Sequence, residues 1–348
     1  MKSFLNKLFS LSLFFLFGYP IFYFVYKFGD VRINGLNDYL SYYKLYKDFA
    51  IFEIDQAYLP RLFSSYLVYA LNKFGWYYDV VIAQQLEGYD QSVYFNAILV
   101  NFLGAIGTGF VLHKIAFDHT KNFLVSHIPG ILYFLSYGLI AWGAYALVDG
   151  FAVFLFVLAF YFYTKRSYWV FLVLFISIFQ RDLILVSLGA LAFIDILLVY
   201  TKQKRINRFL SFVFIWSLAC FITMFILRLT IFKTFTIYAV PASEYLQIFN
   251  QPRYSHGTFF RAIFFSQNLL LFYLITSIWF KVNHGVYLNN RNLTRILFVF
   301  GVIAIMSIII KVPLEIGRYS SIFSPLIPLF LTLDLFNQRK VKSSNQLT

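Results

Sequence analysis

Apolar runs of membrane-spanning length recur along the whole chain, and they limit what it can fold into. A membrane-spanning helix needs about 20 apolar residues, because the hydrocarbon core of a bilayer is about 30 Å thick. Ten runs of 12 to 24 residues approach or reach this length: 8–27, 93–112, 124–146, 149–164, 168–179, 183–200, 209–232, 263–280, 296–310 and 320–336. Only 13% of the residues are charged, against about 25% in soluble domains. The sequence predicts an all-α, polytopic integral membrane protein with about ten transmembrane helices in one domain, residues 1–348.

The long polar segments of the chain are predicted to be extracytoplasmic loops. The first apolar run is predicted to be an uncleaved transmembrane helix, because its basic start is not followed by a small-residue cleavage site. Residues 61–84 are apolar enough to cross a membrane, but Asn72, Lys73 and Asp79 interrupt them, so we expect an interfacial helix there. A crossing at 61–84 is the alternative, and it would reverse every later segment. The first extracytoplasmic loop is then 28–92, with interfacial helices, and the second sizeable one is 233–262.

The distribution of basic residues favours this topology. With ten spans and both termini in the cytoplasm, the inner side holds 16 of the 29 Lys and Arg residues and three of the 15 Asp and Glu residues. Basic residues gather on the cytoplasmic side of membrane proteins. Topology therefore accounts for the net charge of +14, and nucleic acid is not an expected partner. The predicted location is the cell inner (plasma) membrane.

Charged residues cluster at the predicted outer ends of the helices. The apolar stretch "FLVLFISIFQRDLILVSLGALAF" (171–193) contains one polar group of residues, Gln180, Arg181 and Asp182. A charge within a membrane helix costs about 2.5–3.5 kcal/mol on insertion scales, so it is usually paired or functional. The topology places seven such residues on the outer side: Asp38, Arg61, Asp149, Arg181, Asp182, Glu315 and Arg318. We expect them to line one polar cavity that opens toward the outer leaflet.

Each of these residues also has a structural interpretation. The carboxylate of Asp149 can cap the helix that follows it. Arg181 and Asp182 can pair with each other at a break between two helices. Asp38 can be a solvated loop carboxylate, and Arg61 can extend its charged end to the membrane interface. Glu315 and Arg318 can form an ion pair on a helix surface.

Four motifs follow one another along the chain: "NDYLSYYKLY…AYLPRLFSSYLVYAL" (37–71), "ALVDGFAVFLFVLAFYFY" (146–163), "QRDLILVSLGAL" (180–191) and "EIGRYSSIFSPLIPLF" (315–330). Together they resemble bacterial polytopic proteins of the glycosyltransferase-C (GT-C) superfamily. Those proteins have an acidic residue followed by tyrosines and an arginine helix in the first outer loop, and a later helix that begins with Asp. An Arg–Glu or Lys–Glu motif and a Glu-x-x-Arg-Tyr pattern come next. Here Asp182 replaces the Glu, and a serine replaces the proline that follows the arginine of the first loop.

The resemblance implies a GT-C-like fold and a glycosyltransferase. Such an enzyme moves a sugar from a polyprenyl-phosphate carrier to a glycan, lipid or protein acceptor on the extracytoplasmic side. It implies Asp38 as the base that takes the acceptor proton, with Asp149 and Asp182 in reserve. Arginine binds phosphate at two points and stabilises charge that develops on it. The residues implied for phosphate and sugar binding are Arg61, Arg181, Asp182, Glu315, Arg318 and Tyr42.

No cofactor is expected, although Asp38 and Asp149 would suit a divalent cation. The single Cys220 and the histidines do not have metal-site spacing: His113, His119, His127, His256 and His284. The same outer arginines also suit another membrane protein of glycan assembly. A lipid-linked glycan flippase or transporter is a further alternative, which would have ionisable residues near mid-membrane and repeated helical halves.

Overall fold

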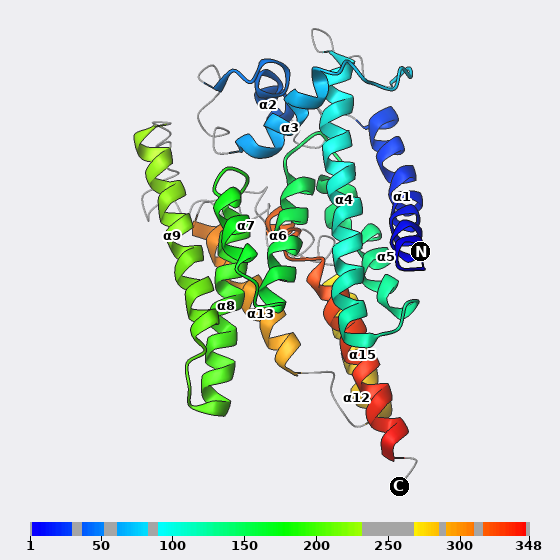
Figure 1. Ribbon diagram of the computed structural model, residues 1–348, viewed down its shortest axis with the longest axis vertical. Helices are drawn as coiled ribbons and strands as arrows, with labels where there is room; N and C mark the ends of the chain where they lie inside the picture. Colours follow the sequence, from blue (N-terminus) through cyan, green and yellow to red (C-terminus); the bar gives the residue numbers. More distant parts are fainter. Residues whose placement is uncertain are drawn as a thin grey trace, which may run out of the picture.

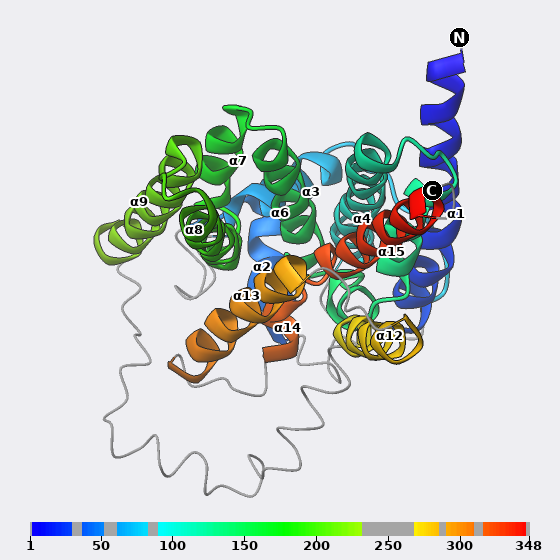
Figure 2. The ribbon, with the colours of Figure 1, turned by 90° about the horizontal axis from the view of Figure 1, so that it is seen from below.

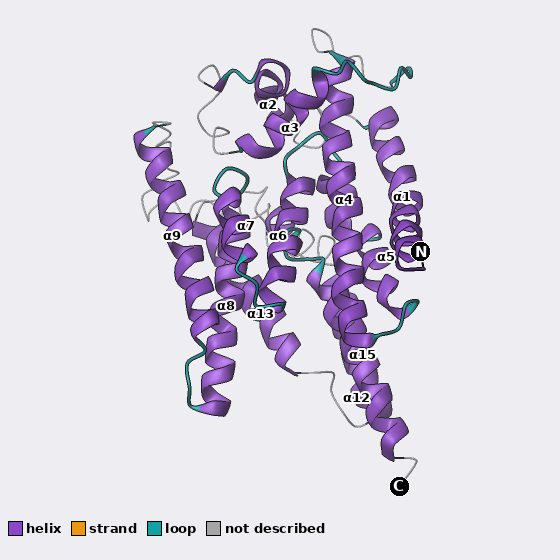
Figure 3. Ribbon diagram, viewed as in Figure 1, coloured by secondary structure: helices purple, strands orange, loops and turns teal. Residues whose placement is uncertain are grey.

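The computed structural model describes residues 2–29, 37–51, 61–82, 90–231, 268–284, 290–309 and 316–345, and in these ranges the regular structure is entirely helical. The predicted all-α class is therefore confirmed (Figure 3). The helices are α1 Lys2–Phe28, α2 Asn37–Asp48, α3 Leu62–Asn72, α4 Gln91–Thr120, η3 Val125–His127, α5 Ile128–Phe134, η4 Leu139–Gly143, α6 Asp149–Thr164, α7 Trp169–Ser177, α8 Asp182–Gln203, α9 Arg208–Thr230, α12 Asn268–His284, α13 Asn290–Ile309, α14 Ile316–Ser320 and α15 Leu326–Asn345.

Four of the described helices are long and apolar enough to cross a membrane. They are Phe4–Phe28, Gln91–Thr120, Asp182–Gln203 and Arg208–Arg228. This indicates a multi-pass membrane protein, but the prediction of ten spans is wrong. The other apolar runs form helices that are shorter, interrupted or charged at one end.

The run at 124–146 shows why apolar composition overstated the number of spans. It folds as a 3₁₀ turn, the seven-residue α5 and a separate π-helical turn, η4. Residues 168–179 contribute only the nine-residue α7. At 1.5 Å per residue, the 16 residues of α6 reach about 24 Å, which is less than the hydrocarbon thickness. The run at 263–280 begins outside the described residues, and α12 starts at Asn268.

Helices α4, α6 and α8 run in the same direction through the bundle, and α4 lies between α1 and α6 (Figures 1 and 2). The start of α6 lies close to α4 and to Gly143 because residue 150 is glycine. A Cβ at Gly150 would collide with the carbonyl of Gly143 and with the side chain of Asn101 on α4. At the other end of the two helices, Asp118 of α4 pairs with Lys165 at 2.8 Å. The start of α6 is thereby fixed against the upper half of α4.

Helices α2 and α3 lie over the end of the bundle at which α4 begins (Figure 1). α3 packs against α2 and α4, and the backbone N–H of Phe63 donates to the carbonyl of Phe179 at 2.8 Å. The helix predicted within 61–84 is therefore present at Leu62–Asn72, while residues 76–82 have no regular structure. Its location at the membrane interface stays a prediction. The second predicted loop, 233–262, lies outside the described residues.

Candidate functional site

Asp149 is the centre of a buried ionic cluster at the α3 end of the bundle. It is the first residue of α6 and is completely buried. Asn101 of α4 secures the chain around it. The Asn101 amide donates to the carbonyls of Tyr145 and Leu147 at 2.6 Å each and accepts the N–H of Phe151 at 2.9 Å. The N-cap position of α6 is Val148, and the Asp149 carboxylate accepts a hydrogen bond from Arg318, so Asp149 does not cap the helix as one interpretation of the sequence had it.

Two guanidinium groups share the Asp149 carboxylate. Arg181 forms an ion pair with Oδ1, and Arg318 Nε donates to Oδ2 at 3.0 Å. The side chain of Arg181 is 1% exposed and that of Arg318 is 11% exposed. Arg181 also lies over the ring of Tyr319, 5.6 Å from its centroid, and its buried Nε has no hydrogen-bond partner among the described residues. One carboxylate thus holds two arginines that water scarcely reaches.

Arg61 lies next to this pair of arginines. It donates a hydrogen bond to the hydroxyl of Tyr42, and its guanidinium lies 5.7 Å from the centroid of that ring. Arg61 and Arg318 both repel the positive charge of Arg181. We call this group, Asp149 with Arg181 and Arg318 and the neighbouring Arg61, the arginine cluster.

Asp182 does not pair with its neighbour Arg181, so the predicted local ion pair is wrong. Arg181 has an extended backbone (φ −163°, ψ 131°) just before α8, and its side chain contacts Asp149 instead. The Asp182 carboxylate accepts the N–H of Leu183 at 2.9 Å and lies 3.5 Å from Arg228 of α9. With side chains 35% and 30% exposed, Asp182 and Arg228 form the accessible edge of the cluster. Arg228 was not among the residues predicted from the sequence.

Gln180 attaches α3 to the cluster. Its Oε1 accepts the backbone N–H of Ser64 at 2.9 Å, and its Nε2 donates to the Ser64 hydroxyl and to the carbonyl of Val148, also at 2.9 Å. Gln180 is completely buried. These three bonds join α3 to the segments that present Asp149 and Arg181.

The structure brings together most of the residues predicted for the site. Arg181 and Arg318 both contact Asp149. Asp182 and Arg61, which is bonded to Tyr42, are close enough to act electrostatically on Arg181. The side chains of Asp38 and Glu315 lie outside the described residues, so their roles and the Glu315–Arg318 pair stay predictions. Asp149 and Arg181 are buried and do not line an open surface. Both oxygens of Asp149 contact arginines, which argues against the divalent cation considered for this residue.

A second buried ionic cluster, absent from the predictions made from the sequence, lies about 20 Å along α8 from Asp182. Asp195 accepts two hydrogen bonds from Arg295 at 2.7 and 2.8 Å and one from the Tyr163 hydroxyl at 2.8 Å. Arg291 lies 3.4 Å away. The spacing of Arg291 and Arg295, one helical turn apart at the start of α13, is the signal that could have indicated it.

Two histidines that look scattered in the sequence are stacked in the fold. The rings of His113 and His127 have centroids 4.0 Å apart. The hydroxyl of Ser10 lies 3.4 Å from His113 Nε2 and 2.9 Å from His127 Nε2. Nowhere in the described ranges do three or more His, Cys, Asp or Glu side chains gather as a metal site would require.

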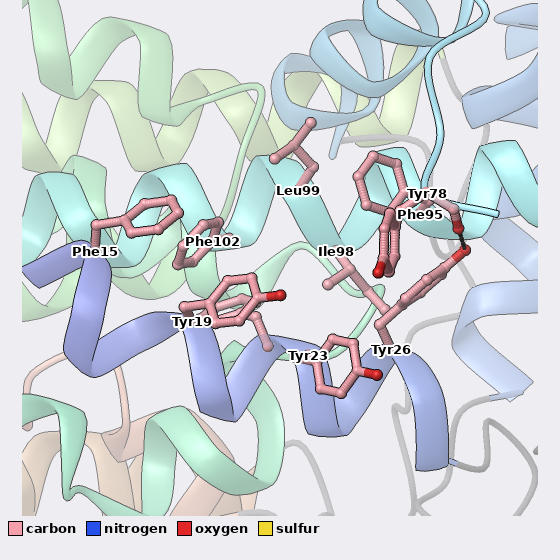
Figure 4. A pocket seen from close by; sticks show the side chains of 10 residues that line it. Phe15, Tyr19, Tyr23, Tyr26, Tyr78, Phe95, Ile98, Leu99 and Phe102 are labelled. Carbon is pink, nitrogen blue, oxygen red and sulfur yellow. Dashed lines mark hydrogen bonds between the residues drawn. The ribbon is translucent and has the colours of Figure 1, made fainter. Parts of the chain in front are cut away.

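An aromatic pocket of about 280 Å³ lies between α1 and α4, apart from the arginine cluster (Figure 4). Phe15, Tyr19 and Tyr23 line it from α1, and Phe95 and Phe102 line it from α4. At one end, the hydroxyl of Tyr26 donates to the carbonyl of Tyr78 at 2.7 Å. The pocket carries no charged group, so the arginine cluster is the better candidate for chemistry.

No protein-family model, curated protein or solved structure matches this chain. The resemblance of its motifs to the GT-C superfamily therefore stays a prediction.

Proposed function

We propose that this chain is a membrane glycosyltransferase that moves a sugar from a polyprenyl-phosphate carrier to an acceptor on the extracytoplasmic side. The observation that carries the proposal is the arginine cluster, in which two guanidinium groups share one buried carboxylate and a third, that of Arg61, is close enough to act electrostatically on Arg181. Phosphate is the anion that matches such a group, because arginine binds it through two parallel hydrogen bonds.

The proposed reaction is a displacement at the anomeric carbon of the sugar. The acceptor oxygen attacks that carbon, and the bond to the carrier phosphate breaks, so the phosphate leaves with the bonding electrons. Negative charge therefore grows on the phosphate as the transition state forms, and fixed positive groups lower the barrier. The acceptor proton goes to a carboxylate, for which we propose Asp38.

The buried ion pairs have a defined part in this proposal. Asp149 offsets one of the two arginine charges that it contacts and fixes the orientation of both side chains. Groups that are already oriented need not reorganise during the reaction. Arg61 and Arg318 are then the arginines that approach the phosphate, and Arg181 and Asp149 hold them in place electrostatically.

Transfer of sugar from a polyprenyl-phosphate donor, measured with purified protein in nanodiscs, tests the proposal. Asp38→Asn should lower turnover by about 10²–10⁴-fold, the usual effect of losing a general base. Arg318→Lys should retain less than half of wild-type turnover, because lysine cannot form the two parallel hydrogen bonds that arginine makes to a phosphate. Arg205→Ala, an exposed arginine beyond the opposite end of α8, should leave turnover unchanged. Full activity of both Asp38→Asn and Arg318→Lys would refute the proposal.

A lipid-linked glycan flippase is the second candidate, and the Asp195 cluster favours it. This cluster lies inside the bundle, as ionisable groups of transporters do. Asp195→Asn should stop lipid translocation in proteoliposomes if the chain is a flippase, and it should spare sugar transfer if the chain is the proposed enzyme. Measuring both activities on one preparation separates the two functions.

A further inference from the structure

An apolar groove of about 370 Å³ runs between α8, α9 and α13. Small residues of α8 form its floor, since Gly189 and Ala190 line it where larger side chains would fill the space. Ser217 of α9 also lines it, but its hydroxyl donates to the carbonyl of Leu185 at 2.5 Å. The groove therefore presents an apolar surface, with its one hydroxyl already bonded.

The two ends of the groove differ in chemistry. At one end Phe193 packs between Phe214 of α9 and Phe298 of α13, with ring centroids 5.5 and 6.0 Å away. The other end begins at Leu185, one turn of α8 from Asp182, where Arg228 closes the charged edge of the arginine cluster. Three arginines attract the negative charge of Asp182 at this end of the groove: Arg228, Arg181 and Arg61. The apolar groove thus begins next to a group of arginine side chains.

The size of the groove sets how much of a chain it holds. A cavity of about 150 Å³ accommodates benzene, with six carbons, so about 370 Å³ accommodates roughly fifteen. Leu185 and Phe193 are eight residues apart, which corresponds to about 12 Å along the helix. Fifteen carbons are three isoprene units, and their methyl branches require the width that the small floor residues leave.

We propose that this groove holds the first three isoprene units of the carrier lipid, and that the chain enters it past the Asp182–Arg228 edge from a phosphate held by Arg61 and Arg318. The inference rests on the proposed function, because it names where the chain of that donor lies. It commits to an isoprenoid chain in preference to a straight acyl chain. Beyond the third unit, Phe193 and its neighbours direct the chain out of the groove into the surrounding lipid.

Binding of prenyl monophosphates of increasing length tests this assignment. Affinity of the purified protein should rise about tenfold or more between two and three isoprene units, as further apolar surface is buried, and then stay level at four units. Val302→Trp should fill the groove and abolish this gain, because Val302 lines it. Ile305→Trp is the matched control, since Ile305 lies three residues along α13 and is 59% exposed.

A second measurement needs no substitution. A farnesyl phosphate with a photoreactive group on its terminal unit should crosslink to Phe193, Phe214 or Phe298. Pentadecyl phosphate, a straight chain of the same carbon number, should bind more weakly than farnesyl phosphate.

The outcomes separate this inference from the proposed function. Three results would overturn the groove assignment while leaving the proposed glycosyltransferase function in place. They are an affinity that does not level off at three isoprene units, crosslinks outside the groove, and equal affinity for farnesyl and pentadecyl phosphate. Absence of binding by every prenyl phosphate, together with absence of sugar transfer, would overturn both.

Discussion

Removing the carboxylate of Asp149 should destabilise the protein far more than removing a surface carboxylate. In the Asp149→Asn variant two arginines face each other without a counter-charge, and their side chains are only 1% and 11% exposed. Removing one partner of a buried ion pair typically lowers the free energy of unfolding by about 3–5 kcal/mol, because the remaining charge is left unpaired away from water. We expect the free energy of unfolding to fall by about this amount.

The assay is unfolding of purified protein in mixed micelles by SDS titration, followed by circular dichroism. The control is Asp118→Asn, whose partner Lys165 has a side chain 45% exposed. Surface ion pairs contribute about 0–1 kcal/mol, so this variant should unfold almost as wild type does. The double variant Asp149→Asn/Arg181→Met should recover part of the loss, because it replaces the unpaired buried charge with an apolar side chain.

Equal stability of Asp149→Asn and Asp118→Asn would refute the reasoning, since it would mean that the two arginines do not depend on Asp149. Failure of the double variant to recover any stability would refute the assignment of the cost to the unpaired charge of Arg181. Both outcomes are read from the same titration.

Three further predictions concern the first loop and its attachment. Gln180→Leu should lose three hydrogen bonds and about 2–4 kcal/mol of stability, and limited proteolysis should then cut at α3 more rapidly. Cysteines introduced at Asn72 and at Gln91, in a background without the native cysteine, should both react with an impermeant thiol reagent added from outside; labelling of one alone would contradict the topology. The hydrogen bond from Lys47, 2.9 Å from Asp90, holds the pKa of that carboxyl below its ordinary value of 3.8. Its stabilisation is thus present above pH 3.8 and lost as the pH falls through the lower folded-state pKa, so Asp90→Asn should make acid unfolding less steep.

The sequence predicted which residues meet in the arginine cluster better than it predicted their partners. Charges at the outer ends of apolar helices indicated that Asp149, Arg181 and Arg318 converge, and these three are in contact. Adjacency suggested Asp182 as the partner of Arg181. The extended backbone of Arg181 ahead of α8 turns its side chain toward Asp149 instead, and no local pattern in the sequence records that conformation.

Interactions between distant helices were also missed for a physical reason. Asp195 and Arg295 are 100 residues apart, yet two hydrogen bonds join them. In the sequence, each resembles an ordinary charge at the predicted inner end of a helix. Arginine is expected there because basic residues gather on the cytoplasmic side. The number of spans was overestimated because composition reports apolar length, whereas the π-helical turn at Leu139–Gly143 and the short α7 depend on how the chain packs.

If the arginine cluster binds the phosphate of a prenyl carrier, the protein should distinguish farnesyl phosphate from farnesol, and this comparison is the most direct test. Wild-type protein should bind farnesyl phosphate at least about tenfold more tightly than farnesol, because charge-assisted hydrogen bonds to the head group contribute about 1.5–3 kcal/mol. Arg318→Gln together with Arg61→Gln should remove this preference while leaving farnesol binding unchanged. Equal affinity of wild-type protein for the phosphate and the alcohol would contradict the account.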